Sequence, residues 1–72
     1  MKIIVSQEPQ EQVRADELLD RLCNGEDVAV DQSNEPVVAL LVKHGLADAF
    51  GGRVSATAKG REVSGRIFHG PQ

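Results

Sequence analysis

The 72-residue sequence has one cysteine, two aromatic residues, and no tryptophan or tyrosine. A single cysteine excludes an intramolecular disulfide and rules out a cysteine-based zinc site. With only two phenylalanines, the chain has no aromatic platform on which the bases of a single-stranded nucleic acid could stack. Its longest apolar run, residues 36–42, is far too short to span a bilayer. We therefore expect neither a membrane anchor nor a membrane partner.

The length fits a single domain, which we assign to residues 1–72, with residues 70–72 expected to fray. A domain of this size buries only about 60% of the surface of its unfolded chain, so its core should be thin. The first residues meet Pro9 early and show no apolar leader followed by a cleavage site. This predicts a cytoplasmic protein.

The net charge of −3 is distributed unevenly along the chain. Residues 1–35 carry nine acidic and three basic side chains, whereas residues 36–72 carry two acidic and five basic ones. The cations of the second half are Lys43, Arg53, Lys59, Arg61 and Arg66. Such a chain can steer an acidic partner toward its second half. The alternative is that both sets of charges are simply solvated and partly neutralise each other within the fold, which would give the same uneven charge distribution.

The first half of the sequence predicts a strand, a helix and a second strand. Residues 2–6 contain three consecutive β-branched residues, typical of a strand. Apolar side chains at helical spacing predict a helix from Pro9 or Gln10 to Cys23. Pro9 suits its first turn, and Asn24-Gly25 suits its end. Cys23 closes the apolar stripe, so we interpret it as a small core residue and not as a nucleophile. Residues 26–30 predict the second short strand.

The second half predicts two further helices with a hairpin between them. Residues 36–44 form an almost entirely apolar helix, capped at its start by Ser33 or Asn34 and at its end by Gly45. The Gly-Gly pair at residues 51–52 predicts a β-hairpin of residues 47–50 and 53–56.

Thr57 is expected to cap a short last helix that reaches about Ser64, although Gly60 weakens it. The sheet should combine the hairpin with either residues 3–5 or residues 28–30. The expected fold class is α+β, with two main helices, a short third helix and a small antiparallel sheet.

Three successive parts of the second half together resemble the end of a winged-helix domain. They are Leu40-Leu41-Val42-Lys43-His44-Gly45-Leu46, the Gly-Gly hairpin, and Thr57-Ala58-Lys59-Gly60-Arg61. Winged-helix regulators often finish with a recognition helix, a Gly-Leu pair, a two-stranded wing and a Leu-Thr-x-x-Gly closure, where this chain has Ala56 in place of the Leu. The resemblance covers about residues 10–64. It implies a winged-helix-like fold whose hairpin is the wing.

The sequence departs from the winged-helix pattern before the recognition helix. A full winged helix-turn-helix has an extra helix of about eight or more residues there. Only residues 31–34 are available, so we expect a single turn. The helix that follows carries Val, Ala and Leu with Glu35, a composition poorly suited to reading base edges.

Two functions follow from these observations. The first is a non-catalytic protein-binding module that acts on the transcription machinery. In size and architecture the chain is similar in kind to small phage proteins that bind host RNA polymerase. This resemblance implies a phage-encoded regulator or inhibitor, which would be located in the host cytoplasm. The alternative is a DNA-binding winged-helix regulator, which the sequence pI of about 5.2 disfavours.

Contact residues can be named for the protein-binding hypothesis. We expect charged contacts from the five late-chain cations, Lys43, Arg53, Lys59, Arg61 and Arg66, and apolar anchors from Ile67 and Phe68. The apolar helix and the Ile-Phe pair exceed what so small a core can hide. A homodimer interface is the other use for these side chains.

No arrangement of residues predicts an enzyme. Asp16 and Asp20 share a helix face, as ordinary solvated acids also do. His44 and His69 have no sequence-near partner for a triad or a metal set. The glycine pair lies in a hairpin and not in a phosphate-binding loop. We therefore predict no catalytic activity, no metal and no cofactor.

Overall fold

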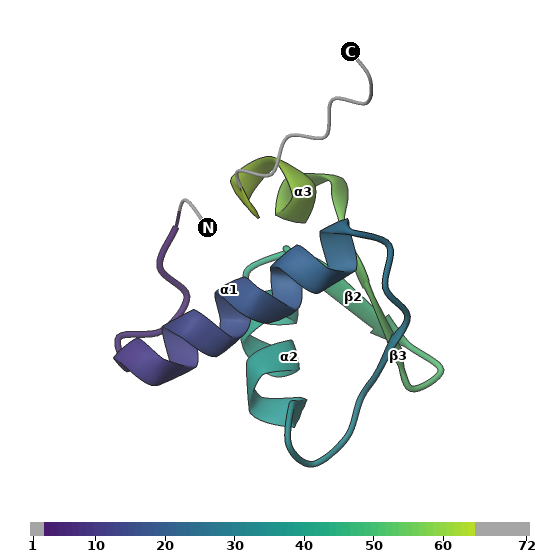
Figure 1. Ribbon diagram of the computed structural model, residues 1–72, viewed down its shortest axis with the longest axis horizontal. Helices are drawn as coiled ribbons and strands as arrows, with labels where there is room; N and C mark the ends of the chain where they lie inside the picture. Colours follow the sequence, from purple (N-terminus) through teal and green to yellow (C-terminus); the bar gives the residue numbers. More distant parts are fainter. Residues whose placement is uncertain (1–2, 65–72) are drawn as a thin grey trace.

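A computed structural model describes residues 3–64 of the chain (Figure 1). In chain order the elements are α1 (Pro9–Cys23), β1 (Val28–Ala29), α2 (Glu35–Lys43), β2 (Ala47–Phe50), β3 (Arg53–Ala56) and α3 (Ala58–Ser64). The three strands form one antiparallel sheet in the order β1-β3-β2. The described residues thus form a mixed α+β fold, as predicted.

The third strand of the sheet comes from the second of the two predicted segments. Val28 pairs with Val54 in β3, and the Val30 N–H donates to the Gly52 carbonyl at 2.8 Å. The predicted strand at residues 2–6 is wrong for its described part. There the Gln12 side chain accepts from the Val5 N–H at 2.8 Å and donates to the Ile3 carbonyl at 3.1 Å. A helix side chain therefore occupies groups that a neighbouring strand would otherwise bind.

Both long helices end where glycine permits a left-handed residue. Gly25 after α1 has φ +85°, and Gly45 after α2 has φ +75°. Beyond α2, the Leu46 N–H donates back to the Leu41 carbonyl at 2.8 Å, which completes a Schellman motif. The predicted helix bounds are therefore confirmed to within a residue, with α2 beginning at Glu35.

The start of α2 is capped differently from the prediction. Asn34 holds the N-cap position, but its side chain makes no capping hydrogen bond. The Asp31 carboxylate is the acceptor instead. It accepts hydrogen bonds from the Ser33 N–H at 2.8 Å and the Asn34 N–H at 3.0 Å. The expected single turn at residues 31–34 is thus held by its own first carboxylate.

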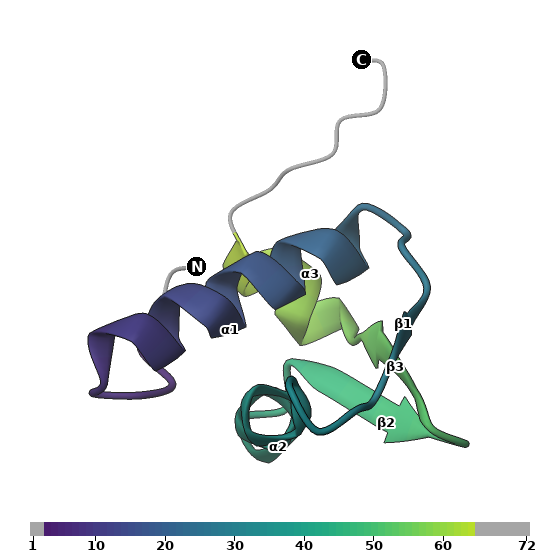
Figure 2. The same cartoon turned by 60° about the horizontal axis from the view of Figure 1, so that its bottom comes forward.

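The core lies between α1, α2 and one face of the sheet (Figure 2). Its most enclosed large side chains are Leu19, Leu41 and Leu46. Cys23 is half-buried and packs against this cluster, in agreement with its interpretation as a core residue. Within residues 3–64, no helix is long and apolar enough to cross a membrane.

Helix α3 docks on the core through a glycine. A Cβ added to Gly60 would lie 2.0 Å from the Leu46 carbonyl oxygen and 3.2 Å from Leu19 Cδ1. Only a residue without a side chain permits this approach. Gly60 thus carries the contact of α3 with the core, although it lowers the helix propensity of the segment.

Candidate functional site

The tip of the β2–β3 hairpin is a two-residue turn with fixed geometry. Gly51 and Gly52 have φ of 60° and 77°, so both central residues lie in the left-handed region, as a type I′ turn requires. Such a turn matches the twist of its flanking strands. It therefore places the two residues beside it, Phe50 and Arg53, directly opposite each other.

Phe50 is the most exposed large apolar side chain among the described residues, at 87%. Side chains of paired residues in an antiparallel sheet lie on the same face. Phe50 therefore shares a face with Arg53, and with Ala29, which pairs with Arg53 from β1. All three are exposed, whereas Val28 and Val54, on the other face, are buried.

Asp48 and Ser55, the next pair on the same face of the hairpin, are also exposed. Figure 2 shows α1 and α3 on one side of the sheet and α2 beside the start of β2. We call the exposed set Ala29, Asp48, Phe50, Arg53 and Ser55 the outer sheet face.

The cation at the hairpin tip already has an anionic partner. Arg53 forms an ion pair with Asp27, and both side chains are more than half exposed. The pair cancels the charge that would otherwise dominate the tip. The outer sheet face therefore offers an aromatic ring beside a neutralised guanidinium, with the Asp48 carboxylate next to them.

The structure does not gather the four predicted cations within residues 3–64 into one site. Lys43 ends α2, and the Lys59 stem lies beside Gly45, so these two residues belong to the base of the hairpin. Arg61 lies farther along α3, and Arg53 lies at the tip, the opposite end of β3. The other predicted contacts, Arg66, Ile67 and Phe68, lie outside the described residues, as do His69 and residues 70–72.

Sequence reasoning named Arg53 at the hairpin tip but missed Phe50. The signal was present, because a two-residue turn at Gly51-Gly52 sets the register of the whole hairpin. That register pairs Phe50 with Arg53, and a residue that pairs with an exposed arginine points away from the core.

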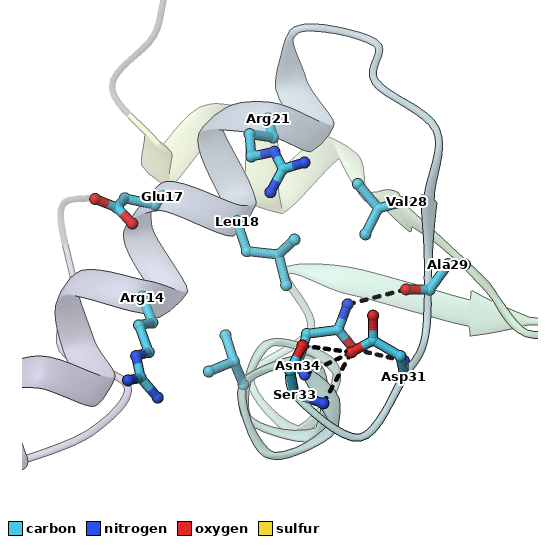
Figure 3. Close-up of a pocket in the computed structure, with 10 residues that line it drawn as sticks. Arg14, Glu17, Leu18, Arg21, Val28, Ala29, Asp31, Ser33 and Asn34 are labelled. Atoms are coloured by element: carbon cyan, nitrogen blue, oxygen red, sulfur yellow. Dashed lines mark hydrogen bonds between the residues drawn. The ribbon is translucent and has the colours of Figure 1, made fainter.

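A concave region lies between α1, β1 and the turn at residues 31–34 (Figure 3). It encloses about 310 Å³. Arg14, Glu17 and Arg21 line its α1 side, and Asp31, Ser33 and Asn34 line the other. Its floor consists of the core residues Leu18, Val28 and Val37. We call this region the α1–turn groove.

The polar groups on the turn side of the groove bind one another (Figure 3). The Asn34 amide donates to the Ala29 carbonyl at 2.9 Å and accepts from the Asp31 N–H at 2.9 Å. The Asp31 carboxylate accepts from the Ser33 hydroxyl at 2.6 Å. This bond, aided by the backbone N–H groups of Ser33 and Asn34, lowers the pKa of Asp31.

On the α1 side, the Arg21 guanidinium is engaged with Glu26 at 3.0 Å. The groove therefore has few polar groups left for a ligand, and we assign it a structural role.

The described part of the chain contains no grouping of three or more His, Cys, Asp or Glu side chains suited to a metal ion. His44 lies at the C-cap of α2, where its Nδ1 lies 3.0 Å from the Leu40 carbonyl oxygen. That contact occupies one ring nitrogen within its own helix. No family model, curated protein or solved structure matches the chain.

Proposed function

We propose that this chain is a non-catalytic protein-binding module that docks through the tip of its β2–β3 hairpin. The observation that carries the proposal is the 87% exposure of Phe50 on a turn whose geometry is fixed. An exposed phenylalanine ring adds no free energy of apolar burial to the folding of the free chain. That free energy is gained only when a partner covers the ring.

The chemistry of the tip fits a protein partner. Aromatic and arginine side chains are enriched at the centres of protein interfaces, where they fill desolvated pockets. The backbone of Phe50 is already paired with Arg53 in the β2–β3 ladder before binding, so little of its backbone entropy is lost on association. The partner surface would offer an apolar pocket for the ring, with a basic group near Asp48.

A DNA-binding regulator is the competing function, and the charges of the described surface weigh against it. Binding to duplex DNA depends on cations that neutralise phosphates. Arg53 is ion-paired with Asp27, and Asp48 lies on the same face. Lys43 and Lys59 lie at the other end of the hairpin, next to the C-cap of α2.

The winged-helix resemblance supports the transcription machinery as the class of partner. The element order from α1 to α3, the Gly-Leu pair after α2 and the Thr57 cap on α3 all agree with that resemblance. In this comparison the hairpin is the wing and α2 is the recognition helix. RNA polymerase is the partner we infer, with the module acting as a regulator or inhibitor.

The proposal is tested by measuring the affinity of the full chain for RNA polymerase purified from the source cell. We expect F50S to weaken binding by about 30-fold, the loss typical of an anchor residue at an interface. I4S is the matched control, because Ile4 is 73% exposed and belongs to the segment before α1. Figure 1 shows that segment away from the β2–β3 hairpin. I4S should change the affinity less than twofold.

A salt series with duplex DNA runs in parallel. We expect weak binding with a shallow dependence of the logarithm of affinity on the logarithm of salt concentration. Equal polymerase affinities for F50S and I4S would remove the hairpin tip from the site. Tight DNA binding with a steep salt slope would favour the DNA-binding regulator, and absence of any polymerase binding would overturn the assigned partner.

A further inference from the structure

The outward side of α2 forms a second surface, separate from the hairpin tip. Val37, Val38 and Leu41 turn into the core and are buried. The side chains that remain exposed are those of Glu35, Pro36, Ala39, Val42 and Lys43. Figure 2 views α2 nearly along its axis, with α1 and the sheet on two sides and the rest of the helix open. We call these five residues the α2 face.

The α2 face has an internal symmetry centred on Ala39. Residues 35 and 43 lie four positions before and after it, and residues 36 and 42 lie three positions before and after it. With about 100° per residue, all four fall within about 60° of Ala39 around the helix axis. The centre is therefore small, its flanks are apolar, and its ends carry opposite charges.

From this pattern we infer that the α2 face is a homodimer interface in which two copies of the chain pack α2 antiparallel about a two-fold axis at Ala39. A two-fold interface brings the same patch together from both subunits, so the patch must complement itself. In this arrangement Glu35 of one chain lies at the same level along the helices as Lys43 of the partner subunit. Ala39 at the axis permits a close approach of the two backbones.

The charge pattern favours a second copy over nucleic acid at this surface. A recognition helix meets base edges and phosphates with its N-terminal residues, where this helix carries Glu35 and Pro36. Antiparallel pairing uses both of its end charges and also places the two helix dipoles in opposite directions. The face of a nine-residue helix is small, so the interface belongs to the weak class that buries less than about 1,200 Å².

The test is sedimentation equilibrium of the full chain between roughly 10 µM and 1 mM, the range in which so weak a dimer forms. Wild type should self-associate as the concentration rises. E35K and K43E should each weaken association at least tenfold, because each sets like charges against one another. The charge swap E35K/K43E should return association to within threefold of wild type. A39R, placed at the axis, should be monomeric throughout.

Matched controls separate the interface from general effects of charge. R61E changes the net charge as K43E does, and E62K changes it as E35K does, on exposed positions of α3. Both should leave association unchanged, and circular dichroism should show every variant folded. F50S should also leave it unchanged, because the dimer surface does not include the hairpin tip.

A wild type that is monomeric at 1 mM, or a swap no better than the single reversals, would overturn the inference. So would equal losses in the α3 controls. Loss of DNA affinity in A39R, with no change in association, would assign the α2 face to nucleic acid instead. None of these results bears on polymerase binding by Phe50, so the two proposals fail separately.

Discussion

The two ends of the β2–β3 hairpin differ in how closely they contact the rest of the fold. At its base, Thr57 donates its hydroxyl to the Gly45 carbonyl at 2.7 Å and accepts the Gly60 N–H at 3.0 Å. The Thr57 N–H also donates to the Leu46 carbonyl at 3.0 Å. At the tip, Phe50 lies in solvent, and a Cβ added to either turn glycine would meet nothing within 4 Å.

This contrast separates residues that hold the fold from residues that are free to serve a partner. The base joins the end of α2, the strands and α3 through the Thr57 hydrogen bonds and the close approach of Gly60 to Leu46. The tip contributes no side chain to the core. Changes at the base should therefore act on the free energy of unfolding, and changes at the tip should act on binding.

Gly60→Ala should have the largest effect on stability. In an ordinary helix interior this change stabilises by up to about 1 kcal/mol. Here the new methyl group would meet the Leu46 carbonyl oxygen at 2.0 Å, and backbone atoms cannot move away cheaply. We expect a loss of at least about 2 kcal/mol in the free energy of unfolding, measured by urea denaturation.

Gly52→Ala is the control at the tip, where the added methyl group meets open space but the φ of 77° is strained. It should cost about 1 kcal/mol. The contrast between base and tip breaks down if Gly60→Ala costs less than Gly52→Ala.

Thr57→Ala should have the next largest effect, about 1–2 kcal/mol. It removes the cap of α3 and leaves the Gly45 carbonyl without the Thr57 hydroxyl. Thr57→Ser keeps the hydroxyl and should retain most of the stability. Thermal unfolding of the three proteins measures the difference. If Ser and Ala prove equally destabilising, the methyl group of Thr57 matters and its hydroxyl does not.

Much of the fold follows from local sequence signals. The apolar stripe of α1, the Gly-Gly turn and the Thr57 cap each depend on neighbours along the chain, and all three were predictable. The strand expected at residues 2–6 failed because β-branched residues report only a preference for extended backbone. The Gln12 side chain, on the following helix, decided which groups bound the Val5 N–H.

The candidate site was less predictable because it depends on contacts between distant residues. Arg53 and Asp27 are 26 positions apart, and nothing in their local sequence marks them as a pair. From the sequence alone, Arg53 was therefore expected to be a cation available to a partner. The α1–turn groove depends likewise on how α1 crosses the turn at residues 31–34, which helical periodicity does not specify.

The smallest effect is expected at the tip, from the Asp27–Arg53 pair. A double-mutant cycle of D27N and R53Q should give a coupling of about 0.2–1 kcal/mol, which falls as salt is added. Both side chains are more than half exposed, so water and ions screen their attraction and little is lost when either is removed. D27N should also free the Arg53 charge and so steepen the salt dependence of DNA binding. A coupling above about 2 kcal/mol would mean that the tip stabilises the fold as the base does. The assignment of stability to the base and of binding to the tip would then be wrong.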